Sequence, residues 1–211
     1  MNELLIKKNN GDYEAAESFN KLKIIWLPGC SAAKIVVHES VLIRGSLAIA
    51  IHNNSKIVIE NNCIFEGANH ISTFKDCEIH IGRSTMIRGA SILLSNEFNL
   101  KVSIGEDCLI APGVYIRPSD AHTIYDIDSQ HVLNKPTSGI CIENHVWIGQ
   151  DAFICKDVHI PQNCVIGARS LVTNKQFEPN SIIAGCPART VKRGINWSKK
   201  FIWQFEKDIK S

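Results

Sequence analysis

Apolar side chains recur along this chain with a period of six residues. The longest unbroken series consists of Ile142, Ile148, Ile154, Ile160, Ile166 and Val172. Shorter series with the same spacing are Val37, Ile43 and Ile49; Ile59, Phe65 and Ile71; Ile81 and Ile87; and Ile104, Ile110 and Ile116. An amphipathic helix repeats about every 3.6 residues and a half-buried strand about every two, so neither keeps this period. The pattern predicts an all-β protein built from stacked hexapeptides.

A second, smaller inward position follows many of these anchors after four residues. These positions are Val41, Cys63, Thr85, Cys108, Val114, Val146, Ala152, Val158, Cys164 and Ser170. Asn, Asp, Gly or Ser residues lie between the two, and these residues tolerate the backbone conformations of sharp corners. Each hexapeptide therefore predicts one short strand and one corner. Three of them close a triangular coil, and successive coils stack in parallel around apolar ladders.

The two ends of the chain depart from the period. The early coils repeat about every 22 residues, so we expect a few extra residues to bulge from each of them. Residues 1–34 predict an irregular N-terminal cap with room for a short helix, and residues 35–190 predict the β-helix. In the tail, residues 191–211, the four-residue spacing of Trp197, Phe201, Phe205 and Ile209 predicts a short amphipathic helix. The spacing leaves open whether this helix covers its own last coil or a neighbouring subunit.

Composition narrows the function classes. Hydrophobic residues make up 45% and charged residues 21% of the 211 residues, as in an ordinary globular protein. The formal net charge of +2, without a basic stripe interleaved with aromatics, argues against nucleic-acid binding. The N-terminal apolar run, Leu4 to Ile6, is too short for a signal peptide or a membrane span, so we expect a cytoplasmic protein. The eight cysteines form no Cys-x-x-Cys pair. We interpret Cys63, Cys108 and Cys164 as small buried fillers of the coils, with Cys77, Cys141 and Cys155 embedded in strand-like stretches, rather than as disulfides, metal ligands or redox groups.

The period stops after Ile116 and resumes at Ile142, so residues 117–141 are expected to leave the coil as an extruded loop. Such an insertion at a solenoid corner is often functional. Of the eight histidines, His122 and His131 lie in this loop. Position alone does not decide between a catalytic base and a solvated side chain, although His122 is the better candidate. Three loop carboxylates either orient an imidazole or only keep the loop soluble: Asp120, Asp126 and Asp128.

Several motifs resemble a known family. They are Ser119-Asp120-Ala121-His122, Asn144-His145-Val146-Trp147-Ile148-Gly149, Ile166-Gly167-Ala168 and Ala184-Gly185-Cys186-Pro187-Ala188-Arg189. With the six-residue period, they resemble the hexapeptide-repeat acyltransferases of the galactoside and xenobiotic acetyltransferase type over residues 35–195. The loop motif and the Gly194-Ile195-Asn196-Trp197 ending resemble the O-acetyltransferases that modify capsular or O-antigen polysaccharides, including polysialic acid O-acetyltransferases. The resemblance implies a left-handed parallel β-helix, a handedness that the general crossover rule does not predict.

The resemblance also implies roles for individual residues. His122 is the implied general base, and the implied assembly is a homotrimer with each acetyl-CoA site in a cleft between two prisms. The implied acetyl-CoA contacts are Trp147, Gln150, Ala168, Thr173, Arg189 and Lys192, the last two near the phosphates. The expected acceptor contacts are Asp120, Tyr125 and Trp147. We expect Trp147 to point outward beside the loop, where it contacts a sugar face or the CoA arm or else fills the trimer interface.

These parts predict an acetyl-CoA-dependent O-acetyltransferase that acts on a sugar hydroxyl of a capsular or other cell-surface polysaccharide, such as polysialic acid. A hydroxyl attacks a thioester once a base takes its proton, and histidine, with an ordinary pKa of about 6.5, suits that task. Direct transfer needs neither an acyl-enzyme nor a metal ion. One alternative is an N-acetyltransferase acting on a nucleotide-linked amino sugar. Another is a zinc enzyme or non-catalytic scaffold of the same fold, which the scattered histidines disfavour.

Overall fold

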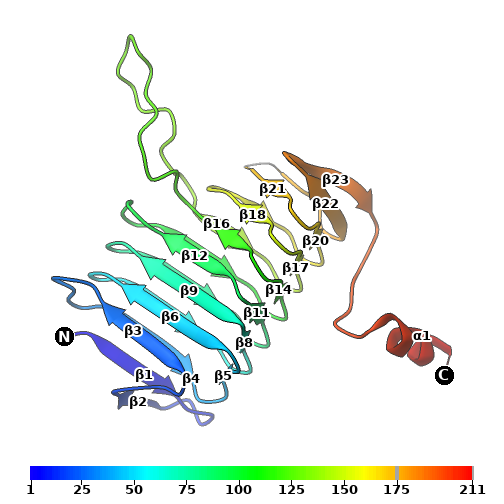
Figure 1. Ribbon diagram of the computed structural model, residues 1–211, viewed down its shortest axis with the longest axis horizontal. Coiled ribbons are helices and arrows are strands. Elements are labelled where there is room, and N and C mark those ends of the chain that lie inside the picture. Colours follow the sequence, from blue (N-terminus) through cyan, green and yellow to red (C-terminus); the bar gives the residue numbers. More distant parts are fainter. Residues whose placement is uncertain (174–175, 211) are drawn as a thin grey trace.

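The computed structural model describes residues 1–173 and 176–210 and shows a triangular parallel β-helix (Figure 1). Each coil contributes one strand to each of three sheets, called A, C and B in the order in which the chain visits them. Sheet A contains β2 (Tyr13–Ala16), β1 (Glu3–Lys7), β4 (Lys34–His38), β7 (Lys56–Ile59), β10 (Glu78–Ile81), β13 (Lys101–Ile104), β16 (Ile140–Ile142) and β19 (His159–Ile160). After each strand of sheet B the chain turns a corner and enters sheet A, and we call the row of these corners the B–A edge.

The other two sheets have the same stacked order. Sheet C contains β5 (Leu42–Ile43), β8 (Ile64–Glu66), β11 (Met86–Arg88), β14 (Leu109–Ile110), β17 (Trp147–Ile148), β20 (Val165–Ile166), β22 (Ser181–Gly185) and β23 (Ala188–Arg193). Sheet B contains β3 (Leu22–Trp26), β6 (Ser46–Ile51), β9 (Ala68–Thr73), β12 (Ser91–Leu94), β15 (Tyr115–Ile116), β18 (Phe153–Ile154) and β21 (Leu171–Val172). Sheet C meets sheet B at the C–B edge. The pairs β1–β2 and β22–β23 are antiparallel, and the remaining pairs are parallel.

The six-residue anchors form the interior of the prism, as the pattern predicts. Ile59, Ile81, Ile104, Ile142 and Ile160 stack on one another in the register of sheet A. None of the anchors is more than 4% exposed. Burial of one such side chain contributes about 1.5–3 kcal/mol, so the ladder is the main source of stability.

The corners use left-handed backbone conformations where the sequence offers Asn and Asp. Asn62, Asp107, Asp157 and Asn163 have φ angles of 58°, 55°, 57° and 61°. A short polar side chain tolerates this region better than a branched or aromatic one. His145, at the equivalent corner of its coil, adopts a φ of 55° as well.

The extra residues of the early coils do not bulge outward, which corrects the expectation from the sequence. They lengthen the strands of sheets B and A instead. In sheet B, β6 and β9 have six residues each while β15, β18 and β21 have two. In sheet A, β7, β10 and β13 have four while β19 has two. Continuous hydrogen-bonded pairing of β6 with β9 gives these residues backbone partners that a bulge would lack.

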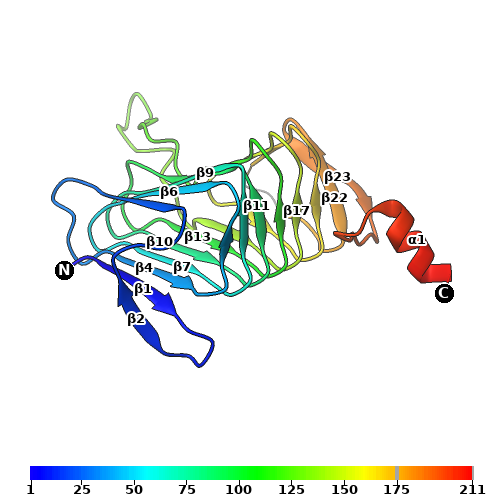
Figure 2. The ribbon, with the colours of Figure 1, turned by 60° about the horizontal axis from the view of Figure 1, so that its bottom comes forward.

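Residues 1–34 are not the irregular cap that the sequence predicts. β1 pairs with β4 and β3 pairs with β6, so the first coil begins at Glu3. Leu4 and Ile6 point into the prism beside Ile35 and Val37. A hairpin formed by β1 and β2 projects from this coil (Figure 2), and its inserted residues hide the repeat in the sequence.

The C-terminal part closes sheet C and then leaves the prism. The hairpin of β22 and β23 follows the last coil, and the helix α1 (Ile202–Lys210) lies beyond it (Figures 1 and 2). The helix contains no buried residue, so it does not cover its own last coil. Trp197, expected in the helix, lies outside it. Within residues 1–173 and 176–210, no helix is long and apolar enough to cross a membrane.

Candidate active site

The loop between β15 and β16 leaves the B–A edge and extends away from the prism (Figure 1). Its outer part is a small antiparallel hairpin, in which Tyr125 bridges Val132. The N–H of Leu133 donates to the carbonyl oxygen of Ile124 at 2.8 Å, and the N–H of Asp126 donates to His131 at 2.8 Å. His122 lies at the foot of this hairpin rather than at its tip.

Asn134 holds the two strands of the loop together at that foot. Its Nδ2 donates to the carbonyl oxygen of His122 at 2.8 Å and to Asp120 Oδ2 at 3.0 Å. Its Oδ1 accepts a hydrogen bond of 2.8 Å from the N–H of Ile124. Both amide hydrogens and the amide oxygen are therefore used, and they fix the backbone on both sides of His122.

The next corner along the B–A edge anchors the same loop. Lys156 Nζ donates to the carbonyl oxygen of Asn134 at 2.9 Å and also to Asp120 Oδ2. Partial burial acts to raise the pKa of Asp120, but the hydrogen bonds from Lys156 and Asn134 outweigh it and lower that pKa. Asp157 Oδ1 accepts from the N–H groups of Thr137 and Ser138 at 2.8 and 2.7 Å, which holds the returning strand of the loop.

His122 lines a pocket of about 280 Å³ at the foot of the loop, together with Asp120, Asn134, Lys135 and Glu97. Its imidazole is exposed and has no hydrogen-bond partner among the described residues. A base that must accept a proton from an incoming hydroxyl needs such a free ring nitrogen. Tyr125 lies higher on the loop and is 51% exposed.

Trp147 does not lie beside the loop of its own chain, contrary to the expectation. It belongs to β17 in sheet C, which is the face of the prism opposite the B–A edge. Its ring, 39% exposed, lies 6.0 Å from the ring of Trp197, measured between centroids. His122 and Trp147 of one chain therefore cannot line the same site.

Trp197 attaches the C-terminal tail to a corner between sheets A and C. Its ring stacks on His145 with centroids 4.3 Å apart, and its Nε1 donates to the His145 carbonyl oxygen at 2.7 Å. The His145 ring lies between Asp107 Oδ2 at 2.7 Å and the Trp197 carbonyl oxygen at 3.1 Å. Lys199 Nζ donates to Asp107 Oδ1 at 2.6 Å, so both ends of this tail segment are held.

The residues implied in acetyl-CoA binding lie around the C-terminal end of the prism. Gln150 and Ala168 are exposed on the C–B edge of successive coils, where the N–H of Arg169 donates to the Gln150 carbonyl oxygen at 2.8 Å. Arg189 pairs in register with Ala184 in the terminal hairpin, and Lys192 lies on the same strand. Thr173 lies apart from them, at the end of sheet B nearer the loop.

The two cations of this group are free to bind an anion. Arg189 Nη1 donates to the backbone carbonyl oxygens of Pro187 and Ala188 at 3.4 and 3.0 Å. No carboxylate of the described residues pairs with Arg189 or Lys192. An unpaired guanidinium and an unpaired ammonium fit the phosphates of a coenzyme.

The buried cysteines are protonated thiols inside the prism. Cys63, Cys77, Cys108 and Cys164 are buried and reduced. Burial raises the pKa of Cys63 to about 12 and that of Cys108 to about 11, so both stay protonated. Among the residues that the structure describes, no group of three or more His, Cys, Asp and Glu side chains is arranged to hold a metal ion.

The structure adds Asn134 and Lys156 to the candidate residues, and the sequence carries no signal for either. Asn134 is twelve positions from His122 and belongs to no repeat. Lys156 occupies an ordinary corner of the period. Only the fold brings these side chains to the foot of the loop.

Comparison with known proteins identifies relatives of this chain in both sequence and structure. No protein-family model matches the chain. The polysialic acid O-acetyltransferase of Neisseria meningitidis is 32% identical over 187 residues, which cover 79% of this chain and 86% of that protein. The polysialic acid O-acetyltransferase of Escherichia coli is 34% identical over 151 residues, 72% of this chain, and the match spans 45% of its own length. The crystal structure of the polysialic-acid-specific acetyltransferase NeuO superposes with a TM-score of 0.80 at 28% identity, covering 98% of this chain and 82% of that one.

Proposed function

Because the chain belongs to the hexapeptide-repeat O-acetyltransferases that include the polysialic acid O-acetyltransferases, we propose that it acetylates a sugar hydroxyl of a capsular or other cell-surface polysaccharide. It shares the left-handed parallel β-helix of these acyltransferases. The observation that carries the proposal is His122, a free imidazole in a pocket at the foot of a loop that Asn134 and Lys156 fix.

His122 is the proposed general base. Acetyl-CoA supplies the acetyl group as an activated thioester. A ring nitrogen of His122 takes the proton of the sugar hydroxyl while the hydroxyl oxygen bonds to the carbonyl carbon. The carbon–sulfur bond then breaks, and the proton passes from His122 to the departing sulfur. The rigid foot of the loop keeps the imidazole in one place during both transfers.

We propose that acetyl-CoA lies between two copies of the chain in a homotrimer. Gln150, Ala168, Arg189 and Lys192 would hold it, with the two cations on its phosphates. These residues lie on sheet C and the C–B edge, whereas His122 lies on the B–A edge. One prism therefore supplies the base and its neighbour supplies most of the coenzyme contacts. Trp147, on the outer face of sheet C, would meet the neighbour's loop in the same cleft.

The N-acetyltransferase alternative receives no support from the relatives. The two relatives matched over 72% and 79% of this chain that are described above are O-acetyltransferases by name. The two products are also easy to separate, since mild alkali cleaves an acetyl ester but leaves an acetyl amide intact.

The test is acetyl-CoA turnover against a panel of glycans with His122→Ala and His131→Ala side by side. We expect His122→Ala to lose at least a hundredfold in turnover, since general-base catalysis contributes roughly 10²–10⁴-fold. His131→Ala, in the same loop, should keep the wild-type rate. CoA binding by His122→Ala should be intact, and the product should be alkali-labile. Equal rates of His122→Ala and wild type would exclude the base role.

A further inference from the structure

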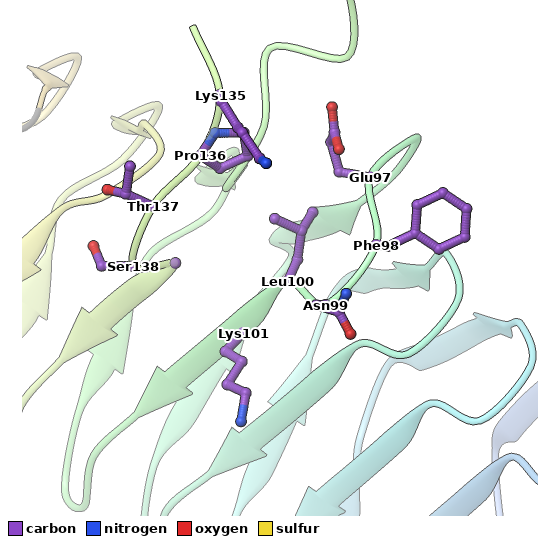
Figure 3. Close-up of a pocket in the computed structure, with 10 residues that line it drawn as sticks. Glu97, Phe98, Asn99, Leu100, Lys101, Lys135, Pro136, Thr137 and Ser138 are labelled. Atoms are coloured by element: carbon purple, nitrogen blue, oxygen red, sulfur yellow. The ribbon is translucent and has the colours of Figure 1, made fainter.

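A groove begins at His122 and continues along the B–A edge toward the N-terminal coils. A second pocket, of about 330 Å³, adjoins the pocket of His122, and Glu97 and Lys135 line both. In Figure 3 buried Leu100 lies between two walls. Thr137 and Ser138 form one wall, and the corner of Glu97 and Phe98 forms the other. The two pockets therefore make one continuous hollow beside the candidate base.

Aromatic rings extend this path beyond the groove. The corners of three successive coils place His52, Phe74 and Phe98 at the B–A edge. The Phe74 centroid lies 5.0 Å from that of Phe98 and 5.4 Å from that of His52, with the rings edge-on at 66° and 77°. Phe98, nearest the groove, is 52% exposed. Successive coils lie about 4.8 Å apart, so the rings form a row along the edge. Phe74 and His52 are half-buried, which leaves Phe98 as the most exposed ring of the three.

Lysines accompany the rings along the same edge. Lys56, Lys75 and Lys135 form no ion pair with a carboxylate of the described residues, and Lys75 Nζ lies 5.8 Å from the Phe74 centroid. Lys101 pairs with Glu78 at 3.2 Å. Asp120 is already neutralised by Lys156, which leaves Glu97, Asp76 and Asp157 as the opposing charges, and the Asp157 carboxylate is engaged by the N–H groups of Thr137 and Ser138. Two lysines line the groove, Lys101 and Lys135 (Figure 3). Lys135 lines both pockets and, unlike Lys101, pairs with no carboxylate of the described residues.

We propose that the B–A edge is a binding track for a linear, carboxylate-bearing glycan and that it presents one hydroxyl of the polymer to His122. Lys135 binds a carboxylate of the sugar next to the reacting one, and Phe98 packs on the C–H face of a sugar further along. This inference rests on the proposed function. It adds that the acceptor is an acidic polymer and that Lys135 and Phe98 of this chain select that polymer.

A track of this kind gives the enzyme a preference for length. A single sugar fills only the pocket of His122, whereas a longer oligomer also reaches Lys135 and then Phe98. Each added contact lowers the KM for the acceptor and leaves the KM for acetyl-CoA unchanged, because the proposed coenzyme residues lie on other faces of the prism.

The experiment uses α-linked sialic acid oligomers of increasing length and the same oligomers with their carboxyl groups reduced to alcohols. For wild type we expect KM to fall with length and to rise on carboxyl reduction. Lys135→Ala should raise KM for the acidic oligomers about tenfold and leave KM for the reduced ones unchanged. Phe98→Ala should raise KM about threefold to tenfold for long oligomers of both kinds and not for short ones.

Tyr13→Ala and Lys21→Ala, which remove an exposed aromatic ring and a lysine far from the edge, are the matched controls and should behave as wild type. Direct binding of a fluorescent oligomer separates the two levels of the proposal. Binding that is weakened by Lys135→Ala but leads to no acetylation contradicts the proposed function and retains the track. Unchanged KM and unchanged binding in both groove variants, or equal effects of Lys135→Ala on acidic and reduced oligomers, overturn the track.

Discussion

The side-chain amide of Asn134 and the backbone carbonyl of His122 are joined by a hydrogen bond of 2.8 Å across the foot of the loop. The same amide accepts a hydrogen bond of 2.8 Å from the N–H of Ile124. A loop with little regular secondary structure therefore holds its histidine through a side chain that substitutes for a missing backbone partner. Asn134 touches no reacting atom in this arrangement, so it is a positioning residue.

Replacement of Asn134 by alanine should lower kcat by about tenfold to a hundredfold, because misplacement of a base by about 1 Å has an effect of that size. The KM for acetyl-CoA should change less than threefold. Asn134→Asp keeps the acceptor for Ile124 but cannot donate to His122, and it should resemble Asn134→Ala. Steady-state kinetics check both. Asn10→Ala is the matched control, since the Asn10 amide also both donates and accepts, with Asp12, in a remote hairpin. Wild-type kcat in Asn134→Ala would refute the positioning role.

The ion pair of Lys156 and Asp120 gives the loop a defined acid sensitivity. The pKa of Asp120 is lower in the folded chain than its ordinary value of about 3.9, so the carboxylate stabilises the loop at every pH above that value. This contribution is lost as the pH falls through the lowered pKa. Loop cleavage by an acid-tolerant protease should therefore stay slow down to about pH 4 and rise below it. Lys156→Met should show fast cleavage at pH 6 as well, and identical profiles would disprove the link.

Gly139 ends the loop at a position where a side chain would be both strained and in close contact with backbone. Its φ is +75°, and a Cβ atom there would lie 2.3 Å from the backbone oxygen of Lys101. Gly29 has nearly the same φ, +71°, but nothing lies within 4 Å of its Cβ position. Gly29→Ala should cost about 1–2 kcal/mol for the left-handed conformation alone. Gly139→Ala should cost about 1–3 kcal/mol more, for the clash. Urea denaturation measures both, and equal losses would contradict the close approach.

The buried cysteines should be inert in the folded protein. Because burial raises the pKa of Cys63 to about 12 and of Cys108 to about 11, neither forms a thiolate at pH 8. Iodoacetamide at that pH should label exposed Cys186 and spare both buried thiols. All of them should react in urea. Mass spectrometry of the labelled peptides decides the outcome, and rapid native labelling of Cys63 would show that the coil opens readily.

The interior of the prism was predictable because every coil needs an apolar side chain at the same inward positions. Ile142, Ile148 and Ile154 face inward from three different sheets, and a six-residue spacing in the sequence records that directly. The corners were equally predictable from the sequence, since Asn62 and Asp107 adopt the left-handed conformations that their side chains tolerate. Local constraints of this kind produce a periodic pattern of residue types in the sequence.

The first coil and the contact of the C-terminal tail could not be predicted from a periodic pattern. Leu4 and Ile6 alternate as in a simple strand, and a hairpin separates them from the rest of their coil. The contact of Trp197 with His145 joins residues 52 positions apart. The four-residue spacing from Phe201 predicts that Trp197 belongs to the C-terminal helix, and nothing in the sequence indicates the contact with His145. Contacts made once, between distant segments, depend on the assembled fold and cannot be seen as a pattern.

The placement of His122 and Arg189 on different sides of one prism has a genetic consequence. If each catalytic centre draws its base from one chain and its coenzyme contacts from the next, His122→Ala and Arg189→Ala damage opposite halves of the cleft. Two inactive variants produced in the same cell should then complement each other, since a mixed trimer contains one interface with both halves intact. Activity recovered on co-expression, and absent when separately folded trimers are mixed, would identify the catalytic unit as the junction between chains.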